Sequence, residues 1–313
     1  MAKYRNALPQ LTSDKWFLTD GGMETDLIFN HGIDLPLFAS ISLFREDDDP
    51  AAITEYFAPY LETAKAQKRG IVLESATWRA SPGWIAQLGY APDEFETLNR
   101  KAIASLNRLR DKHDSAEAPV LASACIGPRG DGYSIDTKMT TGEAEAYHAA
   151  QIILFAETEA DLVTTMTMTY VEEAIGIARA AKAAGMPVVI SFTVETDGRL
   201  PSGQPLGEAV EQVDAATGGY PAYYMINCAH PDHFVPTLRK GGAWVSRIQG
   251  LRANASRMSH EELDNAEELD DGDPHELGHQ YAELVAEFPS LRVLGGCCGT
   301  DHRHIHEIAK ACA

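Results

Sequence analysis

The sequence predicts an α/β fold, a closed (β/α)8 barrel of the TIM type, and three observations support this expectation. Eight short apolar or β-branched runs alternate with helix-like segments along 313 residues, a length typical of such barrels. Several runs are apolar without alternation, as in strands buried on both faces of a parallel sheet. No G-x-G-x-x-G motif follows the first run, which argues against an open dinucleotide-binding sheet.

The eight predicted strands follow one another along the whole chain. They cover residues 16–20, 70–77, 119–125, 161–168, 187–194, 223–228, 244–249 and 291–297. No second set of strands follows the eighth. We therefore expect one domain that spans residues 1–313, the whole chain.

The segments between the strands show helical patterns. Residues 143–160 have a period near 3.6, which predicts that four apolar side chains share one face: Ala146, Ile153, Leu154 and Ala160. Residues 171–185 end at Gly185 with Pro187 two positions later, a common stop signal for a helix.

Two long segments depart from the simplest strand–helix unit. Residues 79–103 have room for a loop and more than one helix. Residues 252–278 are polar and acidic and lie between the last two predicted strands. We expect the second segment to be an extended loop or lid before the last strand rather than a linker between domains.

Composition and charge exclude several classes of protein. The net charge of −20 opposes non-specific binding to nucleic acid. No apolar run approaches the ~20 residues of a membrane span, and the N-terminus lacks the apolar core of a signal peptide. We therefore expect a cytoplasmic protein whose partners are small molecules, with neither nucleic acid nor membrane among them. Its five cysteines, an odd number, argue against a disulfide framework.

Three cysteines lie where the chemistry of such a barrel is usually found, at the carboxyl ends of the strands. Cys228 ends the sixth predicted strand, and Cys297 and Cys298 end the eighth. Two strand spacings amount to roughly 10 Å, which a bend at the flanking glycines can close. Those glycines are Gly295, Gly296 and Gly299. Three thiolates with an open fourth position predict a catalytic Zn²⁺ site.

Other interpretations of the same side chains stay open. Cys228 alone is compatible with a small buried residue, and the vicinal pair alone with a redox couple. Cys125 and Cys312 have no partner motif and are expected to be packing or incidental residues. The three histidines of residues 302–306 are a competing metal set, but only residues four apart share a helix face well.

Five segments carry a resemblance that covers nearly the whole chain. They are "LTDGGMETDL" (18–27), "LESATWRAS" (73–81), "CIGPRG" (125–130), "INCAHP" (226–231) and "GGCCGT" (295–300). With these motifs the sequence resembles the homocysteine S-methyltransferase family, which includes the betaine– and S-methylmethionine–homocysteine methyltransferases and the homocysteine half of cobalamin-dependent methionine synthase. The "NC" and "GGCCGT" motifs together are the most specific part of this resemblance.

The resemblance implies a (β/α)8 barrel with zinc held by Cys228, Cys297 and Cys298. It also implies a methyltransferase of methionine biosynthesis, which transfers a methyl group to the thiol of homocysteine. The metal has a chemical purpose in such a reaction. A free thiol with a pKa near about 8.5 is mostly protonated at neutral pH, whereas the thiolate is the nucleophile. Coordination to a metal deprotonates and orients the thiol.

The loop after the first strand is expected to hold the amino-acid end of the substrate. The residues concerned are Asp20 and the backbone amides of Gly21, Gly22 and Met23. Family members commonly have Asp-Gly-x-x-Gly-Thr-Glu here, so Glu24 and Asp26 depart from the pattern.

A second departure lies at the end of the fourth strand. Many family members have Glu-Thr at this point, and that Glu contacts the ammonium group of homocysteine, whereas this chain has Met166 followed by Thr167. A methionine cannot pair with an ammonium group. Either another acid, such as Glu24 or Glu195, takes this role, or the acceptor is not a standard α-amino thiol. A third alternative for Met166 is that it only fills the core.

The methyl donor is less evident from the sequence. Trp78, together with Trp84, Tyr133 and Tyr170, is compatible with an aromatic cage for an onium donor, and equally with packing under a lid. The onium-type donors that fit are S-methylmethionine, S-adenosylmethionine and betaine. Two other functions stay open: the same zinc chemistry on a different thiol or methylated substrate, and a non-catalytic zinc-binding barrel. The sequence does not indicate an oligomeric state.

Overall fold

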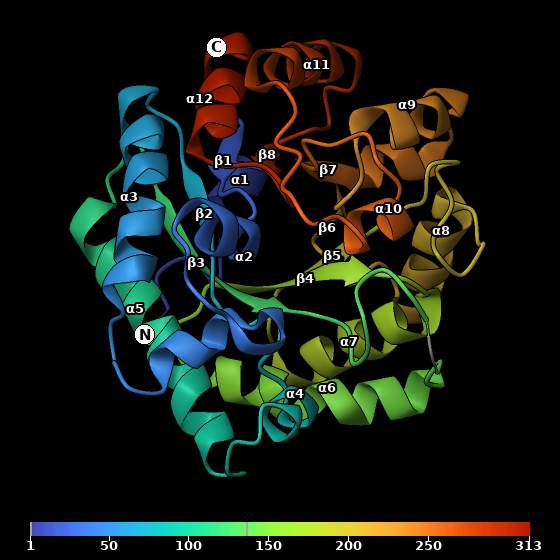
Figure 1. Cartoon of the computed structure of the whole chain (residues 1–313). Coiled ribbons are helices and arrows are strands. Elements are labelled where there is room, and N and C mark those ends of the chain that lie inside the picture. Colours follow the sequence, from blue (N-terminus) through green and yellow to red (C-terminus); the bar gives the residue numbers. More distant parts are fainter. Residues whose placement is uncertain (1, 136) are drawn as a thin grey trace.

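A computed structural model of the chain describes residues 2–135 and 137–313 and shows a closed parallel barrel (Figure 1). Each strand pairs with the next, and the first pairs with the last. The strands are β1 (Phe17–Thr19), β2 (Ile71–Glu74), β3 (Val120–Ile126), β4 (Leu162–Met168), β5 (Val188–Phe192), β6 (Tyr223–Asn227), β7 (Ile248–Ala253) and β8 (Val293–Gly296). The predicted (β/α)8 fold is confirmed.

Helices surround the barrel (Figure 1). They are α1 (Pro9–Thr12), α2 (Met23–Thr25), α3 (Ala51–Ala66), α4 (Pro82–Gln87), α5 (Glu94–His113), α6 (Thr141–Ala156), α7 (Val171–Ala184), α8 (Leu206–Thr217), α9 (Pro231–Lys240), α10 (His260–Asp264), α11 (Pro274–Glu287) and α12 (His302–Ala311). Short π or 3-10 turns are η1 (Asp26–Asn30), η2 (Pro36–Phe38), η3 (Ser40–Phe44) and η4 (Ala243–Arg247). Within the described residues, no helix has the length and apolar character needed to cross a membrane.

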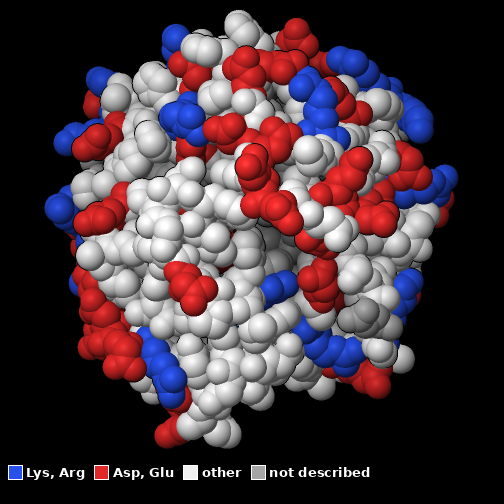
Figure 2. All heavy atoms as spheres, viewed as in Figure 1, with Lys and Arg blue, Asp and Glu red and all other residues white. Residues whose placement is uncertain are grey.

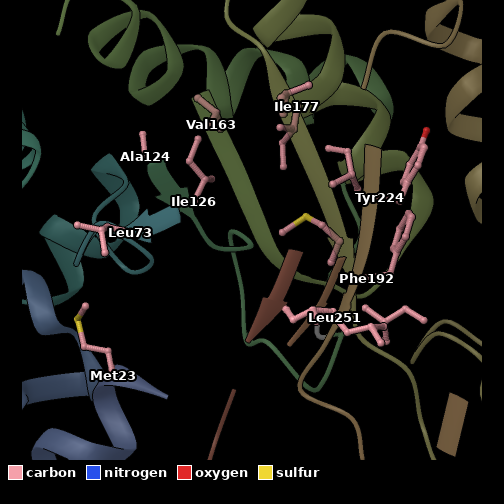
Figure 3. Packing of buried hydrophobic residues seen from close by; sticks show 14 of the residues in the cluster. Met23, Leu73, Ala124, Ile126, Val163, Ile177, Phe192, Tyr224 and Leu251 are labelled. Atoms are coloured by element: carbon pink, nitrogen blue, oxygen red, sulfur yellow. The ribbon is translucent and has the colours of Figure 1, made fainter. Parts of the chain in front are cut away.

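The larger apolar core lies between the strands and the surrounding helices, and it includes Leu73 and Val163 from the strands and Ile177 from a helix (Figure 3). A smaller cluster fills the amino-terminal part of the barrel interior. We call it the apolar layer; its strand residues are Phe17, Val72, Leu121, Leu162, Val189, Tyr223, Met225 and Val293. Leu8, which precedes α1, also belongs to this cluster.

The next inward positions of the strands are polar. Because side chains alternate along a strand, residues two positions farther along share the same face. We call this set the polar layer; it consists of Thr19, Glu74, Ser123, Thr164, Ser191, Asn227 and Arg252, all of them buried. The barrel interior therefore changes from apolar to polar over one step of two residues toward the carboxyl ends of the strands.

The seventh strand is not where the sequence predicts it. The predicted strand at 244–249 coincides mostly with η4, and β7 begins at Ile248. Trp244 packs in the outer core beside Gly207, the second residue of α8, where a Cβ would lie 2.5 Å from the indole nitrogen. As a result Arg252 lies in the strand instead of the inserted loop.

The helix at 141–156 presents a different face from the predicted one. Leu154 and Ala160 are buried, but Ala146 is exposed and Ile153 is 53% exposed. The buried face includes two polar side chains, His148 and Gln151, which bond to Glu173 and to the Thr77 carbonyl oxygen, respectively. A pattern of apolar residues does not reveal polar side chains that are buried together with their hydrogen-bond partners, and the predicted buried face was therefore wrong.

The other local predictions agree with the structure. Residues 79–103 contain α4 and the first half of α5. The helix α7 ends at Gly185, which has a left-handed φ of 67°. Residues 254–273, which include α10, form the long connection between β7 and α11; we call this connection the lid.

Candidate active site

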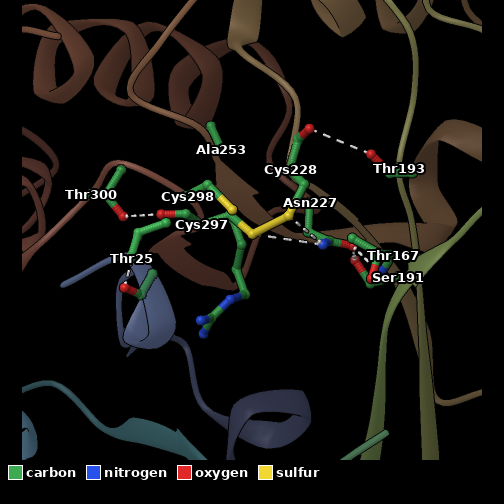
Figure 4. Close-up of a disulfide and its surroundings, with 12 residues drawn as sticks. Thr25, Thr167, Ser191, Thr193, Asn227, Cys228, Ala253, Cys297, Cys298 and Thr300 are labelled. Carbon is green, nitrogen blue, oxygen red and sulfur yellow. Dashed lines mark hydrogen bonds between the residues drawn. A yellow bond between two sulfur atoms is a disulfide. The ribbon is translucent and has the colours of Figure 1, made fainter. Parts of the chain in front are cut away.

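Three cysteine sulfur atoms meet at the carboxyl end of the barrel. The Sγ atoms of Cys228, Cys297 and Cys298 all lie within 4.8 Å of one another, as the sequence predicted (Figure 4). Cys228 follows β6, and the vicinal pair follows β8. Cys228 and Cys297 form a disulfide with their Cα atoms 5.3 Å apart, and Cys298 is free. This disulfide differs from the expectation of five reduced cysteines, and its reduction gives three thiols within reach of one ion.

The backbone that carries these cysteines is fixed by the neighbouring strands. Cys228 has a left-handed φ of 52°, which is unusual for a residue with a side chain. Its amide donates to the Arg252 carbonyl oxygen at 3.1 Å, and the Cys297 amide donates to Ala253 at 2.8 Å. Of the three flanking glycines, Gly299 has the left-handed φ, 77°, that provides the expected bend.

Hydrogen-bond donors face all three sulfur atoms, and the longest contact joins Asn227 Nδ2 to Cys297 Sγ at 3.8 Å. Asn227 Nδ2 donates to Cys228 Sγ at 3.1 Å, and the Tyr133 hydroxyl donates to Cys298 Sγ at 3.3 Å. Asn227 Oδ1 accepts from the Thr167 amide at 2.9 Å, which ties the cysteines to the end of β4. Such donors stabilise negative charge on sulfur and orient metal ligands. The sequence analysis quoted Asn227 in a motif but assigned it no role.

The lid is anchored to this cluster through His260. Its Nε2 lies 2.8 Å from the Cys228 carbonyl oxygen, and its Nδ1 lies 3.2 Å from Glu195. The imidazole also stacks on the Tyr133 ring with centroids 4.1 Å apart. Glu195, which is 37% exposed, pairs with His260 of the lid. It does not line the pocket beside the cysteines.

A pocket of ≈ 80 Å³, here called the inner pocket, lies against the three cysteines. It brings together every substrate-binding residue predicted from the sequence: Asp20, Gly21, Gly22, Met23, Glu24, Trp78, Met166 and Thr167. Residues that the sequence analysis gave no binding role also line it: Thr25, Phe38, Glu74, Ser75, Cys125, Asn227 and Arg252.

Asp20 is held by an ion pair inside the protein. Arg252 donates to Asp20 Oδ1 at 2.9 Å and also bonds to the Thr19 hydroxyl and the Gly21 carbonyl oxygen. The Tyr56 hydroxyl donates to Asp20 Oδ2 at 3.0 Å. Burial alone would lower the pKa of Arg252, but the Asp20 carboxylate raises it. The two charges therefore neutralise each other at the base of the pocket.

The loop amides are also partly engaged. The Gly22 amide donates to the Thr300 carbonyl oxygen at 3.0 Å, so it is not free for a ligand. A Cβ at Gly22 would lie 2.5 Å from the Cys297 carbonyl oxygen. This glycine thus allows the first loop to approach the cysteine loop closely.

Two further carboxyl groups line the inner pocket. Glu24 Oε1 accepts from the Ser40 hydroxyl at 2.7 Å, and burial raises the pKa of Glu24. Burial also raises the pKa of Glu74 to about 7, although the charge of Arg252 acts to lower it. The predicted strand ran past Glu74 to Thr77, whereas β2 ends at Glu74, which therefore lies at the site.

A second pocket of ≈ 380 Å³, the outer pocket, lies between the inner pocket and the lid. The two share Thr25, Phe38, Trp78, Thr167, Cys228 and Cys298. Four acidic residues, Asp131, Asp264, Glu268 and Asp270, line the outer pocket. Arg79 is there too, and it pairs with Asp131 at 3.2 Å. In Figure 2, acidic side chains flank the hollow near the centre of the face.

Only part of the predicted aromatic cage is present in the outer pocket. Trp78 and Tyr133 line it, together with Phe29 and Phe38. Trp84 instead donates from Nε1 to the Pro128 carbonyl oxygen, and the Tyr170 hydroxyl accepts from the Met139 amide. These two rings are engaged elsewhere in the fold.

The competing histidine set does not form a site. His304 is buried and bonds to Asp301 and to the Asp271 carbonyl oxygen, whereas His302 and His306 are exposed. Among the described residues, the cysteine trio is the one group of three or more potential metal ligands close enough to share an ion.

Comparisons with known proteins agree with the fold and the motifs. The sequence model of the homocysteine S-methyltransferase family matches residues 17–312. Methionine synthase of Mycobacterium tuberculosis is 29% identical over 236 residues, which are 71% of this chain and 18% of that protein. Methionine synthase of Mycobacterium leprae is 31% identical over 148 residues, 44% of this chain and 11% of that protein. The matched part of this chain thus spans less than a fifth of the length of these relatives.

Solved structures show the same fold. The homocysteine methyltransferase MmuM from Escherichia coli, in its oxidized form, has a TM-score of 0.76 at 21% identity and covers 98% of this chain and 99% of its own. Its metallated form has a TM-score of 0.74 at 20% identity, and the match covers 96% of this chain and 97% of the MmuM chain.

Proposed function

The chain belongs to the homocysteine S-methyltransferase family, and on that premise we propose that it is a zinc-dependent enzyme that methylates the thiol of homocysteine to give methionine. The donor in this proposal is a small onium compound. Residues 1–313 form the homocysteine-binding barrel domain that carries the whole reaction.

The observation that carries the proposal is the position of the cysteine trio. Cys228 and Cys298 line both pockets, so they lie at the junction between a small inner space and a larger outer one. A methyl transfer joins two substrates in line at one sulfur atom, and this arrangement offers each substrate a separate space. A structural metal site would have no use for two pockets meeting at its ligands.

The side chains present fit a zinc ion. Three sulfur ligands within 4.8 Å of one another form a set that zinc binds, and no fourth protein ligand completes the set among the described residues. Asn227 donates hydrogen bonds to Cys228 and Cys297, and Tyr133 donates to Cys298. When bound, zinc supplies a low pKa and a fixed position for a substrate thiol at the open coordination site.

The chain's own residues do the remaining work. The inner pocket holds the amino-acid end of the acceptor, with the Asp20–Arg252 pair fixing the loop that contains Gly21 and Gly22. The lid, anchored through His260, covers the outer pocket and limits the access of water to the reacting groups.

The outer pocket supports a cationic donor. Asp131 is paired with Arg79, whose guanidinium also lies over one face of the Trp78 ring, 4.7 Å from its centroid. Asp264, Glu268 and Asp270 add negative charge to the same pocket, which Trp78 and Tyr133 also line. Onium groups are attracted to aromatic faces and to carboxylates. S-methylmethionine, S-adenosylmethionine and betaine all carry such a group.

The test is a reconstitution with defined substrates. The reduced protein is loaded with Zn²⁺, and methionine is measured by mass spectrometry after incubation with homocysteine and each of the three donors. We expect about one zinc per chain and methionine from at least one donor. Absence of bound zinc in freshly reduced protein would overturn the proposal.

Met166 favours a second candidate, the same chemistry on a different thiol. It lines the inner pocket where the family's ammonium-binding acid is expected. A panel of thiols assayed with the same donors separates the two candidates. Turnover of another thiol without any methionine formed from homocysteine would establish the second.

A further inference from the structure

The inner pocket contains three carboxyl groups, and they differ in how far the protein itself satisfies them. Asp20 is bonded to Arg252 and Tyr56. Glu24 accepts a hydrogen bond from Ser40. Glu74 is 5% exposed, and hydrogen bonds from the Ser123 and Thr164 hydroxyls act on its carboxyl group, but its Oε2 is buried without a hydrogen-bond partner among the described residues. A buried carboxylate oxygen without a donor is costly, so its retention calls for an explanation.

A complementary group lies close by. Arg252 uses both terminal nitrogens on Thr19, Asp20 and Gly21, but its Nε is also buried without a partner within the described part of the chain. Arg252 and Glu74 both line the inner pocket, and each acts on the charge of the other. The pocket thus offers one unsatisfied acceptor and one unsatisfied donor.

We propose that Glu74 binds the α-ammonium group of the acceptor and that the Nε–H of Arg252 binds its α-carboxylate, so that the enzyme selects α-amino thiols although Met166 replaces the usual acid. This inference rests on the proposed methyltransferase function and deepens it. An α-amino acid carries both charges on one carbon, and its binding satisfies both groups of the protein at once.

Electrostatics favours Glu74 over the other acids. The positive charge of Arg252 is already balanced by Asp20, so an ionised Glu74 leaves the base of the pocket with an excess negative charge. An ammonium group removes that excess. Hydroxyl donors act on both Glu24 and Glu74, but Glu74 is the one with a buried oxygen that lacks a partner, and the positive charge of Arg79 also acts on Glu24. Glu195 lies outside the inner pocket and pairs with His260.

The test compares homocysteine with two analogues that each lack one charge. They are 4-mercaptobutanoate, without the amino group, and 3-aminopropane-1-thiol, without the carboxylate. For the zinc-loaded wild type we expect kcat/KM for homocysteine to exceed that for either analogue by about 100-fold or more, because each analogue leaves a buried partner unsatisfied.

The variant Glu74→Gln removes the charge and keeps the shape. We expect kcat/KM for homocysteine to fall by about 100-fold, mostly through KM, with little change for 4-mercaptobutanoate. Glu24→Gln tests the competing acid of the same pocket; whatever its effect on overall turnover, we expect it to keep the preference for homocysteine over 4-mercaptobutanoate. An equal loss on both thiols in Glu74→Gln, or loss of the preference in Glu24→Gln instead, would overturn the assignment.

A binding experiment keeps this inference separate from the methyl transfer. L-norvaline has the amino-acid end of the acceptor but no thiol, and its binding to metal-free, reduced protein is measured by calorimetry. We expect binding to the wild type to weaken by at least about tenfold in Glu74→Gln. Equal norvaline affinity for both proteins refutes the role of Glu74. Wild type that binds norvaline but methylates no thiol refutes only the proposed function. If Glu74→Gln does not fold, equal turnover of homocysteine and 4-mercaptobutanoate by the wild type decides against the inference.

Discussion

The apolar layer and the polar layer of the barrel interior lie two residues apart on the same strands, yet they differ in almost every physical respect. On β3, Leu121 packs among apolar neighbours, and Ser123 bonds to Thr164 across to β4. On β2, Val72 belongs to the apolar layer, and Glu74 has an oxygen without a partner. The first layer consists almost entirely of apolar side chains, whereas the second contains a buried charged group that the protein leaves partly without partners.

This difference separates stability from binding within one barrel. Burial of the apolar layer contributes to folding without any ligand. The polar layer contains a buried acid and the arginine of a buried ion pair, and Cys228, with its left-handed backbone, directly follows it; all of these cost stability. Proteins retain such features where a ligand completes them, so the polar layer marks the site, and the following changes test that division.

The largest effect is expected at the cysteine trio. Cys298→Ser removes one sulfur ligand, and we expect zinc to fall from about one per chain to below about a tenth. Methyl transfer should fall by about 1,000-fold, because the substrate thiol loses both its activation and its position. Metal analysis measures the zinc content, and a methionine assay measures the rate of methyl transfer. Cys312→Ser, far from the pockets, is the control and should retain both. Zinc retained by Cys298→Ser would contradict the site.

The next effect concerns stability rather than activity. Leu121→Ala removes a side chain from the apolar layer and should lower the free energy of unfolding by about 3 kcal/mol, with KM for homocysteine unchanged. Ser123→Ala, two residues along the same strand, should cost less than about 1.5 kcal/mol. Urea unfolding compares the two variants with the wild type. If both variants lower the free energy of unfolding equally, the apolar layer does not contribute more to stability than the polar layer, and the proposed division between stability and binding is wrong.

Much of this division was predictable from the sequence. Eight buried strands in order, and cysteines at the ends of the sixth and eighth, follow from local patterns and from the geometry of a barrel. The residues predicted on the first loop, together with Trp78, Met166 and Thr167, line the inner pocket, and the three sulfurs meet as expected. Trp84 and Tyr170 of the suggested aromatic cage lie elsewhere. The helix stop at Gly185 is also correct.

The errors share one physical cause, because local patterns do not reveal what a residue packs against. The segment 244–249 has the composition of a strand, but it forms a 3-10 turn in which Trp244 packs beside Gly207. The strand therefore begins later than predicted, and the sequence analysis did not place Arg252 in it. Glu74 was concealed because the predicted strand continues to Thr77, past the true end of β2. The disulfide between Cys228 and Cys297 depends on the approach of two loops, which spacing alone does not give.

A third, smaller effect follows from the raised pKa of Glu74, about 7 in the folded protein because of burial. The ordinary pKa is near about 4.3, so folding favours the protonated acid. The wild type should therefore lose up to about 2–3 kcal/mol of stability as the pH rises from about 4.5 to above 7. Glu74→Gln has no such acid and should lack this loss. Urea unfolding of both proteins at pH 5 and pH 8 measures the difference.

The direction of this effect distinguishes the polar layer from an ordinary ion pair. A carboxylate stabilised by a partner has a lowered pKa, and its protein gains stability as the pH rises. Glu74 is expected to show the reverse, with Glu74→Gln the more stable protein at pH 8. Parallel pH profiles for the variant and the wild type would mean that the pKa of Glu74 is not raised in the folded protein.

The smallest effect is expected at the hydroxyl group that faces Cys298. Tyr133→Phe removes the donor 3.3 Å from Cys298 Sγ and keeps the ring that stacks on His260. Loss of one such donor should weaken zinc binding by about tenfold, because the thiolate charge is less stabilised. Competition with a chelator measures the affinity. Tyr223→Phe removes a hydroxyl from the apolar layer and should leave zinc affinity unchanged, because that layer lies one step below the residues that surround the metal. If both variants lower the affinity for zinc equally, the effect comes from the barrel as a whole. Zinc binding then does not depend on which of the two layers is changed.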